Sequence, residues 1–230
     1  MGRNQHGKGI GAPRGEGATQ REERFKTRRT SSRPRAERLG RRRLDALRAL
    51  PDYLAPGLDI VFVGINPGER SARIGHYYGN PRNPFWRLLH EAGLTPRRLR
   101  PEEDHLLPAF GIGITDIVKR PSRGVGDLAG TEFRRGRAAL EAKLLRVRPR
   151  IVCFNSKTGF VHFFGPRAFR RFGRQAVRIG PSRVFVMPST SPANAAVPLA
   201  AKRRHFVTLR RWRDTLRRHQ VVGAGRPTAA

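Results

Sequence analysis

Short apolar runs, each followed by a polar loop, recur along this chain and limit its fold more than any other feature. The four runs are residues 59–65, 111–118, 151–154 and 183–187. Runs of this length, rich in valine and isoleucine and bounded by glycine, proline, asparagine or serine, indicate buried strands. The chain is therefore expected to build a small sheet from them.

Helical patterns separate or follow these runs. Helices are expected over residues 83–92 and 131–147, and over the very basic stretch 202–218. Strands alternating with helices predict an α/β fold, a three-layer sandwich with a short, mainly parallel central sheet flanked by helices. Ligands of such sheets bind outside the carboxyl ends of the strands, which is where the polar loops lie. A functional site is therefore expected at that edge.

The charge of the chain points to a polyanionic partner. The 230 residues include 48 Lys and Arg against 17 Asp and Glu, a formal net charge of +31. Such an excess favours DNA, RNA or an acidic membrane surface. No run of 18 apolar residues occurs, so no membrane span is expected. The N-terminus has no apolar signal segment, so we expect an intracellular protein, cytoplasmic and nucleoid-associated in a bacterium.

The single cysteine and the histidine spacings carry no metal motif. One cysteine, Cys153, allows no internal disulfide and no cysteine-based zinc site, and it lies in an apolar run typical of the core. The histidines show no paired spacing of the H-E-x-x-H kind. We expect neither a metal nor a cofactor.

Composition divides the chain into three parts. Residues 1–43 are rich in Gly, Arg, Ser, Thr and Pro, which predicts a disordered basic arm. This arm either binds nucleic-acid phosphates without regard to base sequence or is a dispensable tail. Residues 44–222 are expected to form the globular domain, and residues 223–230 a disordered tail.

An ordered set of short motifs suggests a family. The set comprises residues 64–68 (GINPG), 77–78 (YY), 83–86 (NPFW), 111–120 (GIGITDIVKR) and 186–194 (VMPSTSPAN). Together they resemble the mismatch-specific uracil/thymine-DNA glycosylases of the uracil-DNA glycosylase superfamily. The resemblance covers roughly residues 56–218, including FNSK at 154–157 and the basic final helix.

This resemblance implies a base-excision enzyme that swings a nucleotide out of the duplex. It would hydrolyse the N-glycosidic bond of uracil opposite guanine and leave an abasic site, with thymine and modified pyrimidines as further candidates. In the family, the Asn of GINPG holds the attacking water, which places that role on Asn66. An amide is a poor general base, so its contribution would be to position the water. No lysine falls where a Schiff-base nucleophile would stand, so lyase activity is not expected.

The resemblance also implies a base-binding set. Tyr78 falls where the family places an aromatic ring against the flipped base. The remaining members are Ile65, His76 and Ser122, and Asn83, which would brace its loop or bind the base edge. Phe85 and Trp86 are expected in the core.

Asp116 is a departure from the resembled family. Eukaryotic-type relatives carry Asn at this place, and many enterobacterial-type relatives carry Lys. A carboxylate could accept from uracil N3–H, or it could order and deprotonate the water, and burial would raise its pKa. We therefore predict a catalytic or base-reading role for Asp116, the alternative being an Asp that caps the following turn.

The DNA contacts implied by the family centre on residues 189–194, the loop that enters the duplex. Its members are Ser189, Thr190, Ser191, Pro192, Ala193 and Asn194, with Ser71 and Lys157 as further contacts. Ala193 stands where the family has a bulky wedge, and a methyl group fills the hole of a flipped base poorly. Double-stranded DNA with G·U or G·T mismatches is the expected partner, single-stranded DNA is a further candidate, and the protein is expected to act as a monomer.

Two rival functions remain open. One is a glycosylase of the same superfamily with a different preferred base or without mismatch dependence. The other is a basic nucleic-acid-binding protein without turnover. Asn66 speaks against the second, because a binder has no use for a water-holding amide at that place.

Overall fold

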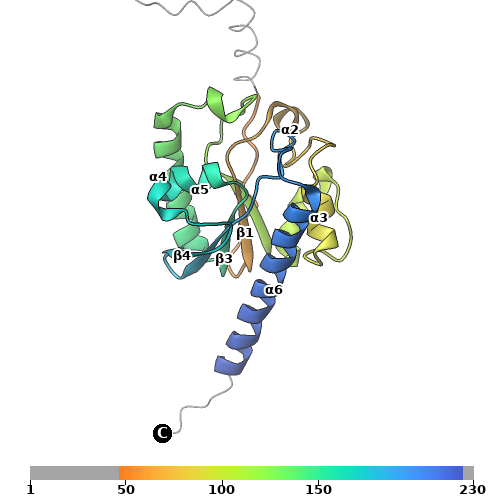
Figure 1. Cartoon of the computed structure of the whole chain (residues 1–230), viewed down its shortest axis with the longest axis vertical. Coiled ribbons are helices and arrows are strands. Elements are labelled where there is room, and N and C mark those ends of the chain that lie inside the picture. Colours follow the sequence, from red (N-terminus) through yellow and green to blue (C-terminus); the bar gives the residue numbers. More distant parts are fainter. Residues whose placement is uncertain (1–46, 225–230) are drawn as a thin grey trace, which may run out of the picture. The chain divides into compact units, whose positions relative to one another are not determined.

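The computed structural model describes residues 47–224 (Figure 1). The basic arm expected over residues 1–43 lies outside this range, as does the expected tail apart from its first two residues. Those two residues belong to the last helix, which ends at Ala224.

A five-stranded sheet forms the middle layer. Its strands are β1 (Ile60–Gly64), β2 (Ile112–Asp116), β3 (Ile151–Phe154), β4 (Gly173–Ile179) and β5 (Ser182–Val186). They lie in the order β2-β1-β3-β5-β4, and all pairs are parallel except β4 with β5. The mainly parallel sheet predicted from the sequence is confirmed. The antiparallel edge strand β4 was not predicted, because arginines interrupt its apolar residues and it lacks a continuous apolar run.

Helices cover both faces of the sheet. The α-helices are α2 (Glu69–Ile74), α3 (Phe85–Glu91), α4 (Gly130–Val147), α5 (Lys157–Phe164) and α6 (Leu199–Ala224), and the 3₁₀ helices are η1 (Pro101–Phe110), η2 (Val125–Asp127) and η3 (Pro166–Ala168). Three of them, α3, α4 and α6, correspond to the predicted helices, although α6 begins three residues earlier and ends six later. The short helices α2 and α5 were not predicted, since each is too short to show a helical repeat.

Alternation along β1 divides the core into two clusters. Ile60 and Phe62 point to the layer of α3 and α6, where Phe85 and Phe206 meet the Phe62 ring. Val61 and Val63 point the other way, into a cluster completed by α4 and α5. All four β1 side chains are at most 2% exposed. Figure 1 shows α4 and α5 on one side of the strands and α3 and α6 on the other, as a three-layer sandwich requires.

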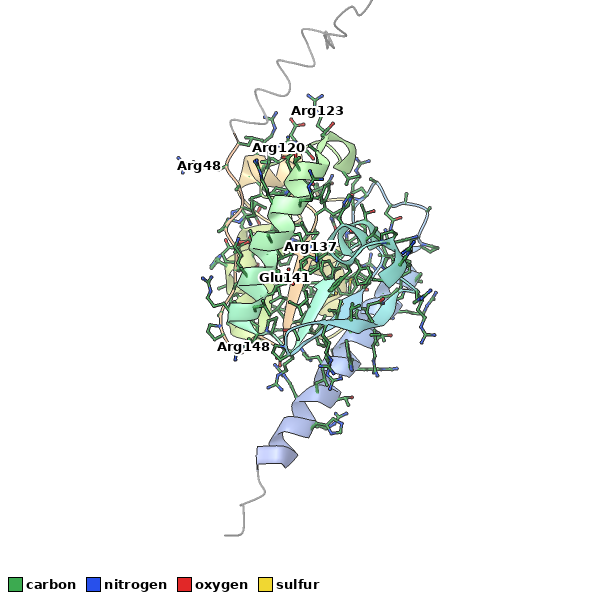
Figure 2. The ribbon with its side chains drawn as sticks, turned by 90° about the vertical axis from the view of Figure 1, so that its left-hand side faces the viewer. Arg48, Arg120, Arg123, Arg137, Glu141 and Arg148 are labelled. Carbon is green, nitrogen blue, oxygen red and sulfur yellow. The ribbon has the colours of Figure 1, made fainter. Side chains whose placement is uncertain are left out.

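The outer surface of α4 is charged. In Figure 2 Arg137 and Glu141 lie along this helix, Arg120 and Arg123 lie near its first turn, and Arg148 lies at its last turn. Between residues 47 and 224, no helix is both long and apolar enough to cross a membrane.

A glycine lets α4 approach the sheet. A Cβ added at Gly136 would overlap the carbonyl oxygen of Ile117, which belongs to the backbone leaving β2. This close contact sets the distance between α4 and the loop that follows β2.

Replacing Gly136 with alanine should therefore destabilise the protein, although alanine is the better helix former by about 1 kcal/mol. Overpacking against backbone typically costs about 1–3 kcal/mol, so Gly136→Ala should lower the free energy of unfolding in a urea titration. Gly130→Ala is the matched control in the same helix, because its added Cβ meets only Arg134 at 3.6 Å. Equal stability of the two variants would contradict this account of the packing.

Candidate active site

The loops that follow β1, β2, β3 and β5 open into one cavity of about 750 Å³, here called the main cavity. The loop between α2 and α3 completes its wall. The expected site residues that line it are Ile65, Asn66, Ser71, Tyr78, Asn83, Asp116, Ser122, Lys157, Ser189, Ser191, Pro192, Ala193 and Asn194. His76 and Thr190 do not line it. The parallel topology thus brings together side chains that are far apart in the sequence.

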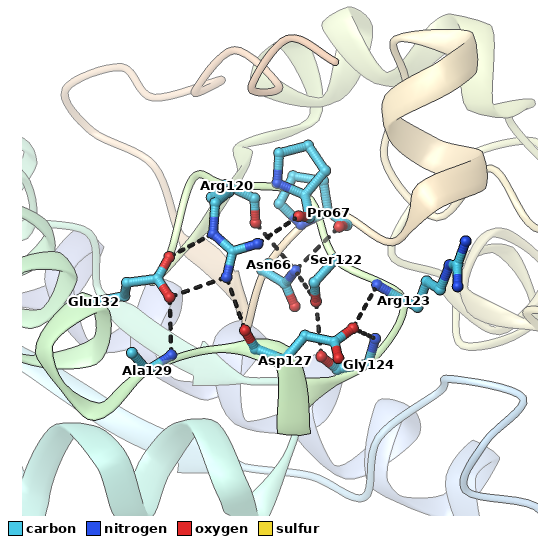
Figure 3. A network of polar contacts seen from close by, with 10 residues as sticks. Asn66, Pro67, Arg120, Ser122, Arg123, Gly124, Asp127, Ala129 and Glu132 are labelled. Carbon is cyan, nitrogen blue, oxygen red and sulfur yellow. Dashed lines mark hydrogen bonds and ion pairs between the residues drawn. The ribbon is translucent and has the colours of Figure 1, made fainter. Parts of the chain in front are cut away.

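The side-chain amide of Asn66 is held in one orientation (Figure 3). Its Nδ2 donates to the carbonyl oxygens of Pro67 and Arg120, both at 3.1 Å, and lies 2.8 Å from Ser122 Oγ. The Ser122 hydroxyl donates its own proton to the Gly124 carbonyl at 2.7 Å, so it accepts from Asn66. Because these partners are acceptors, the NH₂ group must face them. Oδ1 then faces away, and within residues 47–224 it has no hydrogen-bond partner.

An ion pair fixes the loop that supplies these acceptors. Arg120 Nε lies 2.6 Å from Glu132 Oε1, and Arg120 Nη2 lies 3.0 Å from Glu132 Oε2 (Figure 3). Glu132 Oε2 also accepts from the Ala129 backbone at the start of α4. The first turn of α4 is in this way bonded to the residue whose carbonyl holds Asn66. A two-pronged pair of this kind restricts geometry more than a single contact does.

Ser122 lines the main cavity and contacts Asn66. Its side chain is 1% exposed, and its hydroxyl both accepts from Asn66 and donates to Gly124. These two bonds use the proton of the hydroxyl and one of its two lone pairs. They support a role in orienting Asn66, and the contact with a base stays a prediction.

Asp116 lies at the floor of the main cavity, at the last position of β2. It pairs in register with Gly64, the last residue of β1. A Cβ at Gly64 would overlap the Asp116 carboxylate, so only glycine leaves room for it. The Asp116 side chain is 6% exposed, and its buried Oδ2 has no hydrogen-bond partner among residues 47–224.

Burial raises the pKa of Asp116 to about 7, with the positive charge of Lys119 opposing this shift and the negative charge of Asp52 adding to it. Lys119 is itself engaged, because its Nζ lies 2.7 Å from Asp52 Oδ1. Asp52 also accepts from Lys143 Nζ at 2.6 Å and from Thr115 Oγ1 at 2.5 Å. Because Lys119 is already paired with Asp52, its positive charge offsets the negative charge of Asp116 only in part.

Tyr78 is held on one face by Phe85. Their ring centroids are 3.8 Å apart with an interplanar angle of 23°, and the Tyr78 backbone has a φ of 50°. Left-handed backbone is uncommon for a tyrosine and marks a loop fixed by its surroundings. Tyr78 lines the main cavity, so the ring face away from Phe85 is the one left for a base.

Asn155 is a site residue that the motif analysis did not single out. Its Nδ2 donates to Tyr78 Oη and to Thr190 Oγ1, both at 2.9 Å, and its Oδ1 accepts from the Thr190 backbone at 3.3 Å. It thus connects the aromatic wall with the loop expected to enter DNA. Its signal in the sequence was its place directly after β3, within the FNSK motif.

Three expected contacts are used to build the loop between α2 and α3. His76 Nδ1 lies 3.2 Å from Asp104 Oδ1, outside the main cavity, so its position does not support a base contact. Ser71 Oγ accepts from the Gly79 backbone, and Asn83 Oδ1 accepts from the Phe85 backbone at the start of α3. Asn83 therefore braces its loop, which was one of its two expected roles.

The loop after β5 is held by its own hydroxyls. Ser189 Oγ accepts from the Ser191 backbone, Ser191 Oγ accepts from the Ala193 backbone, and Asn194 Nδ2 donates to the Ser189 carbonyl. Lys202 Nζ, from the first turn of α6, donates to the Asn194 carbonyl at 2.8 Å. Ala193 and Lys157 both line the main cavity, and both are exposed.

Metal ligands do not gather at this site. In the part of the chain that the structure describes, no group of three or more His, Cys, Asp or Glu side chains could hold a metal ion.

Comparison with known proteins identifies the family. The family described as the uracil DNA glycosylase superfamily matches residues 51–213, which include all the residues that line the main cavity except Leu50. The chain belongs to this superfamily. Its fold also resembles the solution NMR structure of a proposed uracil DNA glycosylase from Methanosarcina acetivorans, with a TM-score of 0.51 and 25% sequence identity. That match covers 71% of this chain and 98% of the other.

Membership in the uracil DNA glycosylase superfamily agrees with the three-layer fold and with the resemblance carried by the motifs. It supports a hydrolase of the glycosidase class that acts on DNA in repair.

The raised pKa of Asp116 predicts a dependence of stability on pH. Its pKa is about 7 when folded, against 3.8 for an unperturbed Asp. The unfolded state therefore loses this proton at lower pH than the folded state does, so stability should fall as pH rises from about 4 to about 7 and level off above. Asp116→Asn removes this loss, which amounts to at most about 4 kcal/mol for a shift of this size.

Urea unfolding of wild type and Asp116→Asn would measure this difference. The titrations would be run at about pH 4.5 and about pH 8, below and above the pKa of Asp116 in the folded state. The variant should gain stability relative to wild type at the higher pH. A stability difference that stays the same at both pH values would contradict the burial of an unpaired carboxylate at position 116.

Proposed function

We propose that this protein is a monofunctional uracil-DNA glycosylase that removes uracil mispaired with guanine and leaves an abasic site. The observation that carries the proposal is the fixed amide of Asn66, whose Oδ1 is left to accept a hydrogen bond at the cavity wall. A water molecule that donates to this oxygen would be held for attack on the sugar. Superfamily membership supports the reaction class.

The proposed reaction needs no covalent enzyme intermediate. The bond between C1′ and the base breaks, and its electron pair leaves with the base while positive charge develops on the sugar. The water held by Asn66 adds its oxygen to C1′, and its proton passes to Asp116 or to the departing base. Positioning supplies most of the effect, because a placed water replaces one that would have to be captured from solution.

Asp116 can take part in two protonation states. With a pKa of about 7, its carboxyl group is present in both forms near neutral pH. The ionised form can accept the proton of the attacking water or a hydrogen bond from uracil N3–H. The protonated form can donate to a carbonyl oxygen of the base, which an ionised carboxylate cannot do.

The mismatch preference follows from the small residue at the tip of the loop after β5. Ala193 is small and exposed, so little side-chain volume enters the hole left by a flipped base. A poor wedge favours bases that are already weakly paired, because their extrusion costs less. Uracil opposite guanine should then be released more readily than uracil opposite adenine, with thymine opposite guanine as a weaker substrate.

A panel of labelled oligonucleotides tests this order. Strands carrying G·U, A·U, G·T or single-stranded uracil would be incubated with the protein and then cleaved by alkali at abasic sites. We expect the fastest excision from G·U and no strand break before alkali treatment. Equal rates on G·U and A·U would keep the chemistry and remove the mismatch preference, whereas no excision from any substrate would overturn the proposed activity.

Variants at Asn66 and Ser122 test the proposed role of the fixed amide. Asn66→Ala should lower kcat for excision by about 10²-fold or more while DNA affinity is retained. Ser122→Ala leaves two of the three acceptors of Asn66 in place, so a smaller loss, about tenfold in kcat with little change in KM, is expected.

Ser182→Ala is the matched control for Ser122→Ala. Ser182 is also a buried serine, but its hydroxyl has no hydrogen-bond partner in the structure and it lies at the start of β5, away from the main cavity. The Ser182→Ala variant should excise uracil at the rate of wild type. If Ser122→Ala behaved like Ser182→Ala, the hydroxyl would not be needed to orient Asn66.

A further inference from the structure

A second cavity, here called the basic groove, lies beside the main cavity. Its volume is about 510 Å³, and it shares Asn83 and Pro192 with the main cavity. Its lining residues come from the start of α3, the segment before η1, the loop after β5 and the first turn of α6. Three of its lining residues, Asn83, Thr190 and Pro192, belong to the predicted base-binding or DNA-contacting sets, whereas its arginines take no part in the proposed excision reaction.

The charged residues that line the groove are all basic. Four of its lining residues are basic, namely Arg82, Arg87, Arg98 and Lys202, and within the described chain no Asp or Glu lines it. The main cavity differs, because Asp116 and Glu69 line it together with its basic residues. A concave surface of one charge sign attracts ions of the opposite sign, here anions.

Two of these cations are available for a ligand. The side chains of Arg82 and Arg98 are exposed, and neither forms an ion pair with any residue between 47 and 224. Arg87 is shared, since its Nε lies 2.5 Å from Glu91 Oε1. Lys202 is 6% exposed and is used to hold the Asn194 carbonyl. Guanidinium groups are well suited to phosphate, because they present several donors in a plane.

The loop after β5 separates the two cavities. Ser189, Ser191, Ala193 and Asn194 line the main cavity, whereas Thr190 and Ala195 line the basic groove, and Pro192 lines both. A loop of this kind, inserted into a duplex, has the flipped nucleotide on one face. Its other face, which bears Thr190 and Ala195, is turned to the part of the duplex that stays in place, and this part includes the complementary strand.

We propose that the basic groove binds a backbone phosphate of the DNA strand opposite the flipped nucleotide, through Arg82 and Arg98. This inference rests on the proposed function, because it places the flipped uracil in the main cavity. In this proposal, the protein recognises a duplex by binding the second strand, because Ala193 is too small to act as an effective wedge. Phosphate contacts of this kind set position and affinity and do not read sequence.

The test compares duplex and single-stranded DNA for the double variant Arg82→Ala/Arg98→Ala. Dissociation constants and excision rates would be measured on a uracil strand alone and on the same strand annealed to its complement. The duplex Kd should rise tenfold or more at low salt, with values for the single strand within twofold of wild type. The slope of log Kd against log salt should fall by about 1 for the duplex, because one phosphate contact is lost.

Arg146→Ala/Arg218→Ala is the charge-matched control. Both arginines are exposed, and neither lines either cavity. This variant loses the same charge and should keep the duplex affinity of wild type within about threefold. A loss of duplex affinity equal to that of the groove variant would show that only total charge matters, and it would overturn the proposal.

Two further outcomes would also overturn it. An equal loss on single-stranded and duplex DNA would mean that the groove holds the uracil strand itself, and no loss on either would mean that it takes no DNA phosphate. The binding measurements do not need turnover. If wild-type protein excised no uracil, the proposed function would fail while the comparison of duplex and single-stranded affinity still decided the role of the groove.

Discussion

The site depends on a missing side chain at one register position of the sheet. Gly64 and Asp116 stand side by side at the carboxyl ends of β1 and β2, and a Cβ at Gly64 would occupy the space of the carboxylate. The strand pairing therefore fixes the depth of Asp116. Because the carboxylate is buried there without a full set of partners, its pKa rises and it can exchange a proton near neutral pH.

Rigidity around this position comes from bonds between loops. Glu132 holds Arg120, whose carbonyl in turn helps to hold the Asn66 amide. On the opposite wall, Asn155 bonds to both Tyr78 and Thr190. The polar groups of one loop are thus satisfied by those of another, which keeps the cavity in shape before any substrate arrives. Such preorganisation lowers the cost of aligning the reacting groups in a site.

The sequence was informative wherever a pattern is local. Short apolar runs revealed four strands of the sheet, and the rule for parallel sheets placed their polar loops at one edge. The hydrogen-bond partners of individual side chains could not be predicted from the sequence, because they come from distant segments. Ser122 lies 56 positions from Asn66, and Asn155 lies 77 positions from Tyr78. His76 shows the same limit, since its neighbour Asp104 comes from η1 and not from its own motif.

The two borders of the sheet bear on how the protein behaves when it is concentrated. At one border Tyr53 exchanges two backbone hydrogen bonds with Ile114, which covers part of β2. At the other, β4 has an irregular register between Arg174 and Arg178, and both arginines are exposed. Covered, bent or charged borders resist the addition of a strand from another molecule. The sheet is therefore protected against edge-to-edge aggregation, even where the polyanion that its positive charge attracts gathers many copies together.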